Sequence, residues 1–267
     1  MTKPSSRVPW WLVALVGLGI TALASAFATE GYSAIFGAVA SGLGVTLSVT
    51  LISFAFALLL GLGLALLRVA PWRWAREIAT FYIELVRGLP MLVVLYYIAF
   101  VGVPALASGL NMLFSPLIQA GWMGPFQSRD FDFATRAVLA LTLGYGAFLA
   151  EIFRAGIESV DQGQVEAAQA LGLNRGQAMV HIVLPQALKN VLPSLANEFI
   201  AMVKDSALVS VLGVQDITQM GKVYSASTFQ FFETYNVVAF FYLCLTVSLS
   251  LLVKQLERKL KRPTSPS

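Results

Sequence analysis

Charged side chains interrupt two otherwise apolar stretches of the sequence, and the first stretch contains an acid and a base together. Glu84 and Arg87 lie three residues apart, so a helix would carry them on one face. Gly88 and Pro90 follow directly, and Pro90 leaves the carbonyl oxygen of Val86 without its helical donor. A broken helix with free backbone groups beside charged side chains is suited to bind a charged or zwitterionic ligand.

The second stretch carries two acids. Glu198 and Asp205 lie seven residues apart, about 20° apart on a helical wheel, whereas Lys204 points elsewhere. Charged groups in an apolar environment are costly, and by default they face a bundle interior or a water-filled path. Two interpretations stay open for Arg87 and Asp205. Each either contacts a ligand or belongs to a structural ion pair, Glu84 with Arg87 and Lys204–Asp205 with a neighbouring subunit.

A third charged cluster closes an apolar stretch. Glu151, Arg154 and Glu158 fall at positions i, i+3 and i+7, so one helix face carries all three. This spacing favours a structural ion network that fixes the polar segment that follows.

Several kinds of chemistry are excluded. Cys244 and His181 are the only cysteine and the only histidine, so the chain cannot form an internal disulfide or build a zinc or iron–sulfur site. No stretch resembles a phosphate-binding loop, a nucleophile with its base, or a dinucleotide fingerprint. We therefore expect no cofactor in this chain and no ATP hydrolysis by it alone.

The composition indicates a membrane protein. Of 267 residues, 57% are hydrophobic and 12% are charged, with a mean hydropathy of +0.75, whereas about a quarter of the residues in a soluble domain are charged. The pI near 9.3 reflects a net charge of only +4, and no basic stripe runs through polar sequence, so nucleic acid is excluded as a partner.

Apolar stretches of about 20 residues predict transmembrane helices. The sequence contains six of them, at 10–28, 39–67, 78–103, 133–153, 191–213 and 235–253. Residues 104–132 mix Gly, Pro and Trp with short apolar pieces, which indicates an extracytoplasmic loop with a short surface or re-entrant helix. The predicted fold is an all-α integral membrane bundle.

Basic residues set the predicted orientation, because Lys and Arg near the ends of spans stay in the cytoplasm. With the N-terminus inside, 13 basic residues flank the spans on the cytoplasmic side and three lie outside. Residues 24–26, Ala-Ser-Ala, also resemble a signal-peptide cleavage site, but the uncharged run of about 18 residues exceeds the usual 7–15. We expect an uncleaved helix and two cytoplasmic termini; cleavage would leave five spans and invert none of them.

The longest polar segment, 154–190, falls on the cytoplasmic side in this topology. Helix formers fill 158–170, Gly172 suits a helix C-cap, and Pro185 interrupts any helix that runs into it. The segment therefore predicts two short helices joined by a glycine turn beneath the bilayer. It either docks into a partner, because Leu171, Leu173, Met179 and Ile182 have little to cover them, or lies on the lipid headgroups.

Seven residues of this segment match a known signature. The sequence resembles the E-A-A-x3-G-x9-I-x-L-P motif of ABC importer permeases at Glu166, Ala167, Ala168, Gly172, Ile182, Leu184 and Pro185. The stretches 42–47, 84–90, 150–154 and 204–210 resemble the polar amino acid branch of that family, and the likeness spans about 40–255. One departure is Ser206-Ala207, where a typical member has Thr-Ser.

The resemblance implies a five-span core of the MetI-like type over residues 31–267, preceded by an additional helix in 1–30. It implies a permease subunit of an ATP-driven importer of a polar amino acid in the bacterial cytoplasmic (inner) membrane. The implied partners are a second permease subunit, identical or paralogous, a cytoplasmic ATPase dimer that binds ATP and Mg²⁺, an extracytoplasmic solute-binding protein, and membrane lipid. The segment 154–190 would then be the coupling loop that contacts the ATPase.

An amino acid substrate needs complementary charges along its path. Arg87 could bind the carboxylate bidentately, and Glu84, Glu198 or Asp205 could bind the ammonium, with Gly88, Pro90 and Ser206 along the same path. Two other functions stay open, a secondary transporter driven by an ion gradient and a membrane scaffold that recruits a soluble partner. The sequence contains no evident inverted repeat, which argues against the secondary transporter.

Overall fold

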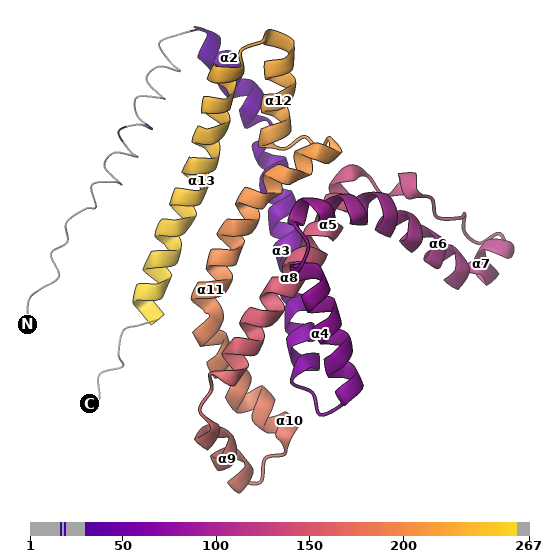
Figure 1. The fold of residues 1–267 in the computed structure, drawn as a ribbon, viewed down its shortest axis with the longest axis vertical. Helices are drawn as coiled ribbons and strands as arrows, with labels where there is room; N and C mark the ends of the chain where they lie inside the picture. The colour runs from indigo at the N-terminus through magenta and orange to yellow at the C-terminus, as the bar shows by residue number, and fades with distance from the viewer. Residues whose placement is uncertain (1–16, 18, 20–29, 261–267) are drawn as a thin grey trace, which may run out of the picture.

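The structure, a computed structural model, describes residues 17, 19 and 30–260, and over this part of the chain it contains helices and no strand. Among the described residues, four helical stretches are long and apolar enough to cross a membrane: Gly31–Arg68, Met91–Leu113, Phe133–Glu158 and Phe231–Gln255. The predicted all-α, multi-span fold is confirmed (Figure 1). The first predicted span, 10–28, and its alternative cleavage site lie outside the described residues, apart from residues 17 and 19.

The second predicted span, 39–67, is a helix that is broken near its start. α2 (Glu30–Ala40) ends before Gly42, and α3 (Leu43–Arg68) follows it. An added Cβ atom on Gly42 would lie 2.4 Å from the carbonyl carbon of Asp216, which precedes α12 (Ile217–Thr228). Only glycine fits this contact. The break between α2 and α3 lets α2 pack against α12 while α3 continues through the bundle.

The third predicted span, 78–103, is wrong as a single helix. α4 (Arg73–Arg87) ends at Gly88, and α5 (Met91–Tyr97) begins after Pro90. Proline lacks the N–H that would continue α4. The chain then runs through a π-helix, η1 (Ile98–Gly102), into α6 (Val103–Leu113), so the membrane-length stretch is Met91–Leu113.

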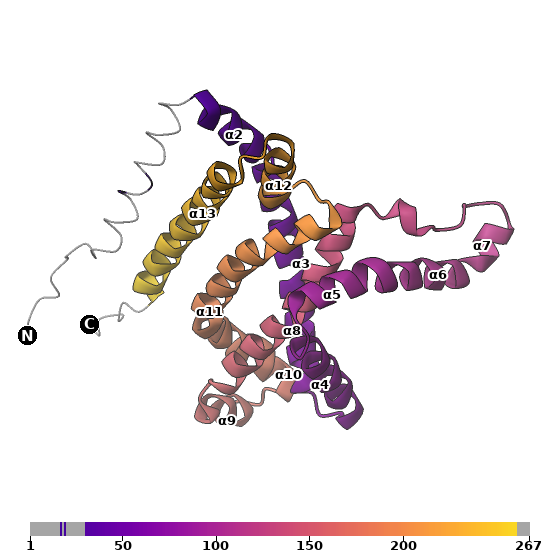
Figure 2. The ribbon, with the colours of Figure 1, turned by 45° about the horizontal axis from the view of Figure 1, so that its top comes forward.

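The region 104–132 is accordingly less of a loop than the sequence predicted. It begins with most of α6, because Pro104 lies in the first turn of that helix, where a missing N–H costs little. It also contains α7 (Ser115–Gln119) and the 3-10 turn η2 (Ser128–Asp130). Figures 1 and 2 show α5, α6 and α7 projecting sideways from the bundle. Arg136 fastens this arm, since its guanidinium donates to the carbonyl oxygens of Ala99 (3.0 Å), Ser128 (2.6 Å) and Phe131 (2.9 Å).

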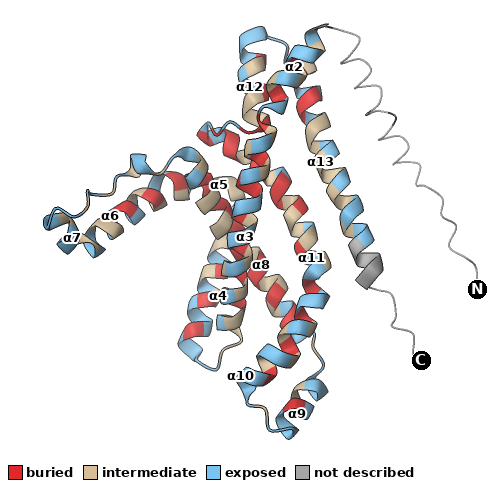
Figure 3. Ribbon diagram, turned by 180° about the vertical axis from the view of Figure 1, so that it is seen from behind, coloured by how far each residue is buried: buried red, intermediate tan, exposed pale blue. Residues whose placement is uncertain are grey.

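α8 (Phe133–Glu158) is the central helix. Asp132 caps its first turn by accepting a 2.7 Å hydrogen bond from the Thr135 N–H. Leu141 and Leu149 are fully buried, and they belong to a core that α8 forms with α3 and α11 (Leu184–Asp205). The buried residues in Figure 3 concentrate along this central group of helices.

The fifth predicted span, 191–213, differs from the observed helix in both bounds. α11 begins at Leu184, and its last residue, Asp205, leads into the 3-10 helix η4 (Ser206–Leu212), which ends at Gly213 with φ +83°. α11 is absent from the four apolar stretches of the described chain because polar residues follow one of its faces. The sixth predicted span, 235–253, lies within α13 (Phe231–Leu260).

Different helices lie at the two ends of the bundle. α9 (Gln162–Ala170) and α10 (Arg175–Ala178) lie together at one end, beyond the ends of α8 and α11. The start of α13, α2 and α12 lie at the opposite end (Figures 1 and 2). A site at one end is therefore a full helix length from the other.

Candidate functional site

The segment between α8 and α11, residues 159–183, is called here the α9–α10 loop, and its own backbone fixes its shape. Asp161 caps α9 by accepting a 2.8 Å hydrogen bond from the Gly163 N–H. α9 ends in a Schellman motif, in which the Gly172 N–H donates to Gln169 (2.9 Å) and the Leu173 N–H to Ala168 (3.1 Å). Gly172 has φ +85°, as its C-cap position predicted.

A second set of local bonds builds the other half of the α9–α10 loop. Asn174 and Gln177 form a capping box, with the Gln177 N–H 2.9 Å from Asn174 Oδ1 and the Asn174 N–H 3.0 Å from Gln177 Oε1. α10 then passes through a π-helix, η3 (Met179–Val183), into α11, which carries Pro185 in its first turn. The predicted pair of short helices joined by a glycine turn is observed.

The signature residues divide into buried and exposed members. Ala168 is buried, Ile182 and Leu184 are half-buried, and Glu166, Ala167, Gly172 and Pro185 are exposed. The expectation that four apolar side chains lack cover is only partly right, because Leu173, Met179 and Ile182 are half-buried while Leu171 is 83% exposed. The loop thus presents Leu171 and the Glu166 face of α9 outward.

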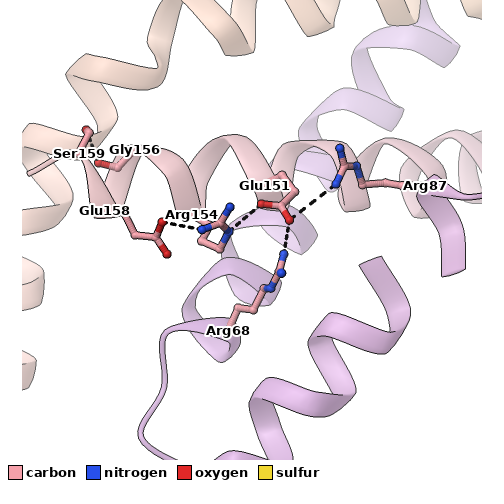
Figure 4. A network of polar contacts seen from close by, with 7 residues as sticks. All are labelled: Arg68, Arg87, Glu151, Arg154, Gly156, Glu158 and Ser159. Carbon is pink, nitrogen blue, oxygen red and sulfur yellow. Dashed lines mark hydrogen bonds and ion pairs between the residues drawn. The ribbon is translucent and has the colours of Figure 1, made fainter. Parts of the chain in front are cut away.

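Glu151 is the centre of an ion network at the end of α8 (Figure 4). Its Oε2 atom accepts a 2.7 Å hydrogen bond from Arg154 Nε, and its Oε1 atom contacts the guanidinium of Arg68, the last residue of α3. Arg154 also reaches Glu158 at 2.5 Å. The predicted network of Glu151, Arg154 and Glu158 is observed, but Arg68 was not foreseen as a member.

Arg87 joins this network loosely. Its Nη1 atom lies 3.7 Å from Glu151 Oε1, beyond hydrogen-bond length, and its side chain is 39% exposed. The pair of Glu84 with Arg87, one of the two interpretations left open, is not observed, because Glu84 is exposed and forms no ion pair in the part of the chain that the structure describes. Arg87, the last residue of α4, instead approaches Glu151 on α8.

A cavity of about 680 Å³ opens beside this network, between α8 and α11. Arg87, Glu151 and Arg154 line it from one side. Its other polar walls are Ser159, Asn190 and Ser194, and the Asn190 amide donates to Ser159 Oγ at 3.0 Å. The cavity therefore combines hydroxyl and amide groups with the guanidinium of Arg87, which lies 3.7 Å from Glu151 and 5.8 Å from the centroid of the Phe148 ring.

A polar stripe continues from the cavity along α11. Asn190, Ser194, Glu198 and Asp205 fall within about 80° of one another on the helical wheel. Glu198 and Asp205 are half-buried, and among the described residues neither forms an ion pair with a basic side chain. Asp205 Oδ2 instead accepts a 2.9 Å hydrogen bond from the hydroxyl of Tyr145 on α8.

The structure thus brings together only part of the predicted ligand path. Arg87 lines the cavity, whereas Glu198 and Asp205 lie further along α11 on the polar stripe and do not line it. Ser206 is fully buried and donates to the carbonyl oxygen of Val203 at 2.7 Å, and Gly88 and Pro90 are exposed at the break after α4. Sequence reasoning missed Tyr145, Ser159, Asn190 and Ser194, whose only signal is polarity at helical spacing.

Comparison with known proteins gives consistent results. Residues 57–262 match the model of a family described as binding-protein-dependent transport system inner membrane component. The chain is 35% identical over 217 residues to the probable glutamine ABC transporter permease protein GlnM of Bacillus subtilis (strain 168), covering 81% of this chain and 90% of that protein.

Solved structures share the fold. A crystal structure of an amino acid ABC transporter with histidines aligns with a TM-score of 0.70 and 36% identity over 87% of this chain and 97% of that one. The inward-facing MetNI methionine ABC transporter aligns with a TM-score of 0.67 at 20% identity, over 88% of this chain and 100% of that one, which supports the predicted MetI-like fold.

Proposed function

The chain belongs to the family of binding-protein-dependent transport system inner membrane components, and on this premise we propose that it is the permease subunit of an ATP-driven importer of a polar amino acid. The similar proteins support amino acids as the class of substrate, because the GlnM relative is named for glutamine and the 36% identical structure is of an amino acid transporter.

The cavity between α8 and α11, with the polar stripe that continues from it along α11, is the observation that carries the proposal. A free amino acid bears an ammonium and a carboxylate, so its path needs a cation and an anion of the protein. Arg87, which is held only by its 3.7 Å approach to Glu151 and its contact with the Phe148 ring, would bind the carboxylate. Glu198 and Asp205, which form no ion pair within the described part of the chain, would bind the ammonium. Charged groups at such positions are expected to serve the substrate path.

The α9–α10 loop would couple ATP binding and hydrolysis by the ATPase subunits to movement of the helices of this chain. Its exposed face, with Glu166, Ala167 and Leu171, would dock on a cytoplasmic ATPase subunit. Val183 holds the loop to the bundle, because it packs with Ile157 of α8 and Ala187 of α11. Gly172 would hold the two short helices at a fixed angle. The loop would join α11 through Ile182, Leu184 and Pro185. Movement of the loop would therefore move α11, which lines the cavity.

The working complex would contain two permease subunits, identical or paralogous, two ATPase subunits and an extracytoplasmic solute-binding protein. ATP and Mg²⁺ would bind to the ATPase subunits, since the sequence of this chain has no phosphate-binding loop. The charge asymmetry of 13 basic residues against three supports cytoplasmic termini and a cytoplasmic α9–α10 loop. The purified single chain should therefore show no ATPase activity.

Replacement of Arg87 by methionine tests the substrate role. The apolar stem is kept and the charge is lost, so uptake of the amino acid should fall to background. Assembly and basal ATPase activity should persist, because Glu151 keeps Arg68 and Arg154 as partners when Arg87 is removed. The measurement is uptake into proteoliposomes together with subunit association on a sizing column.

Arg73→Met is the matched control, since Arg73 begins the same helix and its side chain is 86% exposed beside Glu77. It should transport like the wild type. Normal uptake by Arg87→Met would refute the substrate role of Arg87, and a loss of assembly would make Arg87 a structural residue.

A further inference from the structure

Arg87 shares the wall of the cavity with a carboxylate of this chain. Arg87 ends α4 and Glu151 lies on α8, and both line the cavity between α8 and α11. Arg87 Nη1 lies 3.7 Å from Glu151 Oε1 (Figure 4), and the two side chains are 39% and 17% exposed. The group proposed to bind the carboxylate of a substrate therefore already faces a carboxylate inside the site.

The closest contacts of Glu151 are with other guanidinium groups. Its Oε2 atom accepts a 2.7 Å hydrogen bond from Arg154, and its Oε1 atom contacts Arg68 directly. Glu158 pairs with Arg154, so the described network contains three guanidinium groups and two carboxylates. One positive charge is thus in excess, and it belongs to Arg87, the guanidinium with the longest contact to Glu151.

The contacts of Arg87 leave it able to change partner. Its guanidinium carbon lies 5.8 Å from the centroid of the Phe148 ring on α8, a cation–π contact that uses none of its N–H donors. The distance to Glu151 exceeds hydrogen-bond length, but opposite charges at 3.7 Å still attract each other, and they do so more strongly in a partly buried site than in bulk water. A small shift of the long side chain would bring it within hydrogen-bond distance of either Glu151 or a carboxylate in the cavity.

We propose that Glu151 and the carboxylate of the substrate compete for Arg87, and that Glu151 is a positioning residue that promotes release of the substrate. The inference rests on the proposed function, because it takes the Arg87 site as the binding site of an amino acid. In the occupied site the substrate carboxylate would supply the third negative charge and accept the paired N–H donors of Arg87. After release, Glu151 would draw Arg87 back, which disfavours rebinding of the substrate.

The place of Glu151 on α8 connects it to the α9–α10 loop. Ser159, the first residue of that loop, follows Glu151 by about two helical turns and lines the same cavity. Arg154 and Glu158 lie between them and bond to each other along α8. A movement of the loop would therefore reach Glu151 through the end of α8, which would time the release of the substrate with the ATPase cycle.

Glu151→Gln tests the competition, because competition and structural damage change the affinity in opposite directions. Glutamine keeps the shape of the side chain and removes the charge that attracts Arg87, so the Kd of the substrate should fall about fivefold and its dissociation should slow. A merely structural role would raise the Kd, since a loosened network holds Arg87 less well. The measurement is equilibrium binding of radiolabelled glutamine and arginine, the amino acids named in two similar proteins, to the complete transporter in lipid nanodiscs. In proteoliposomes KM and kcat should fall together, because release becomes slower.

Two further variants keep the test decisive if the loss of one charge weakens the fold. Arg68→Gln leaves Glu151 Oε1 without its closest partner, so Arg87 should be drawn to Glu151 and the Kd should rise. The double variant Glu151→Gln with Arg68→Gln removes both partly buried charges, which limits the loss of stability, and its Kd should again lie below that of the wild type.

Glu158→Gln is the matched control, since Arg154 keeps its bond to Glu151 in that variant, and it should bind the substrate like the wild type. A Kd that is unchanged or raised in both Glu151→Gln and the double variant would overturn the competition alone. A lower Kd in both, with a higher Kd in Arg68→Gln, would support it. Absence of both binding and ATP-driven uptake of amino acids in the wild-type transporter would refute the proposed function, and this inference with it.

Discussion

The α9–α10 loop and the ion network around Glu151 lie at the same end of the molecule, but different kinds of contact fix their conformations. The loop is shaped by hydrogen bonds between residues two to five positions apart, at Asp161, Gly172 and Asn174. The network joins residues as much as 83 positions apart, Arg68 with Glu151, from the ends of α3 and α8. A substitution in the loop should therefore alter the contact between the loop and its partner, whereas a substitution in the network should lower the stability of the helical bundle.

The largest effect is expected for Glu151→Gln. Glutamine cannot neutralise the guanidinium groups of Arg68 and Arg154, which pack around the carboxylate. Since the Glu151 side chain is only 17% exposed, the loss should lower the free energy of unfolding by about 3 kcal/mol. Chemical denaturation of the purified complex in detergent measures it.

Glu158→Gln is the control for that experiment. Glu158 is 55% exposed and pairs with Arg154 alone, so its replacement should cost less than about 1 kcal/mol. Equal losses for the two variants would mean that Glu151 is not the centre of the network.

A smaller effect on stability and a large effect on coupling are expected for Gly172→Val. Nothing lies within 4 Å of an added Cβ atom, so the cost is the strain of φ +85°, about 1–2 kcal/mol, and it is confined to the loop. The complex should assemble but lose uptake and stimulated ATP hydrolysis. Gly172→Asn should keep both, because asparagine tolerates this conformation. A valine variant with normal uptake would contradict the coupling role of the loop.

Arg87→Lys should reduce affinity without affecting the fold. Lysine keeps the charge but not the two parallel donors of the guanidinium, so the KM for uptake should rise about tenfold. The unfolding midpoint should match the wild type, because Arg87 is only loosely bound to Glu151. An unchanged KM would show that substrate binding does not depend on the geometry of the Arg87 guanidinium.

The smallest effect concerns the cap of α8, another locally fixed feature. Hydrogen bonds from Thr135 hold the pKa of Asp132 below its ordinary value. A depressed pKa gives stability that is present above the ordinary pKa and is lost as pH falls through the folded-state pKa. Asp132→Asn keeps a good cap without a titrating group, so the wild type should lose slightly more stability than this variant between about pH 5 and pH 3. Thermal unfolding at both pH values measures the difference, and identical pH dependence would contradict the role of the charge.

The same contrast explains what could be predicted from the sequence. Gly172, the short helices beside it and the break at Pro90 follow from local backbone chemistry, and the structure has all of them. The spacing of Glu151, Arg154 and Glu158 on one helix was also sufficient. These features need no knowledge of which helices meet.

Contacts between helices were not predictable from one sequence. Glu84 is closer to Arg87 in the sequence than Glu151 is. Arg87 nevertheless pairs with Glu151, because α4 packs beside α8. Ser206 was placed on the ligand path, but it begins a 3-10 helix and is fully buried in the core. The pairing of Tyr145 with Asp205 depends on how α8 crosses α11, which periodicity does not encode.

We propose that ATP hydrolysis by a partner drives amino acid movement through the cavity and along the polar stripe of α11. The most direct test is uptake of a labelled amino acid into proteoliposomes that contain the permease, the ATPase and the solute-binding protein. Uptake should require enclosed ATP and should persist when ionophores collapse every ion gradient. Uptake driven by an ion gradient without ATP, or by the permease chain alone, would contradict it.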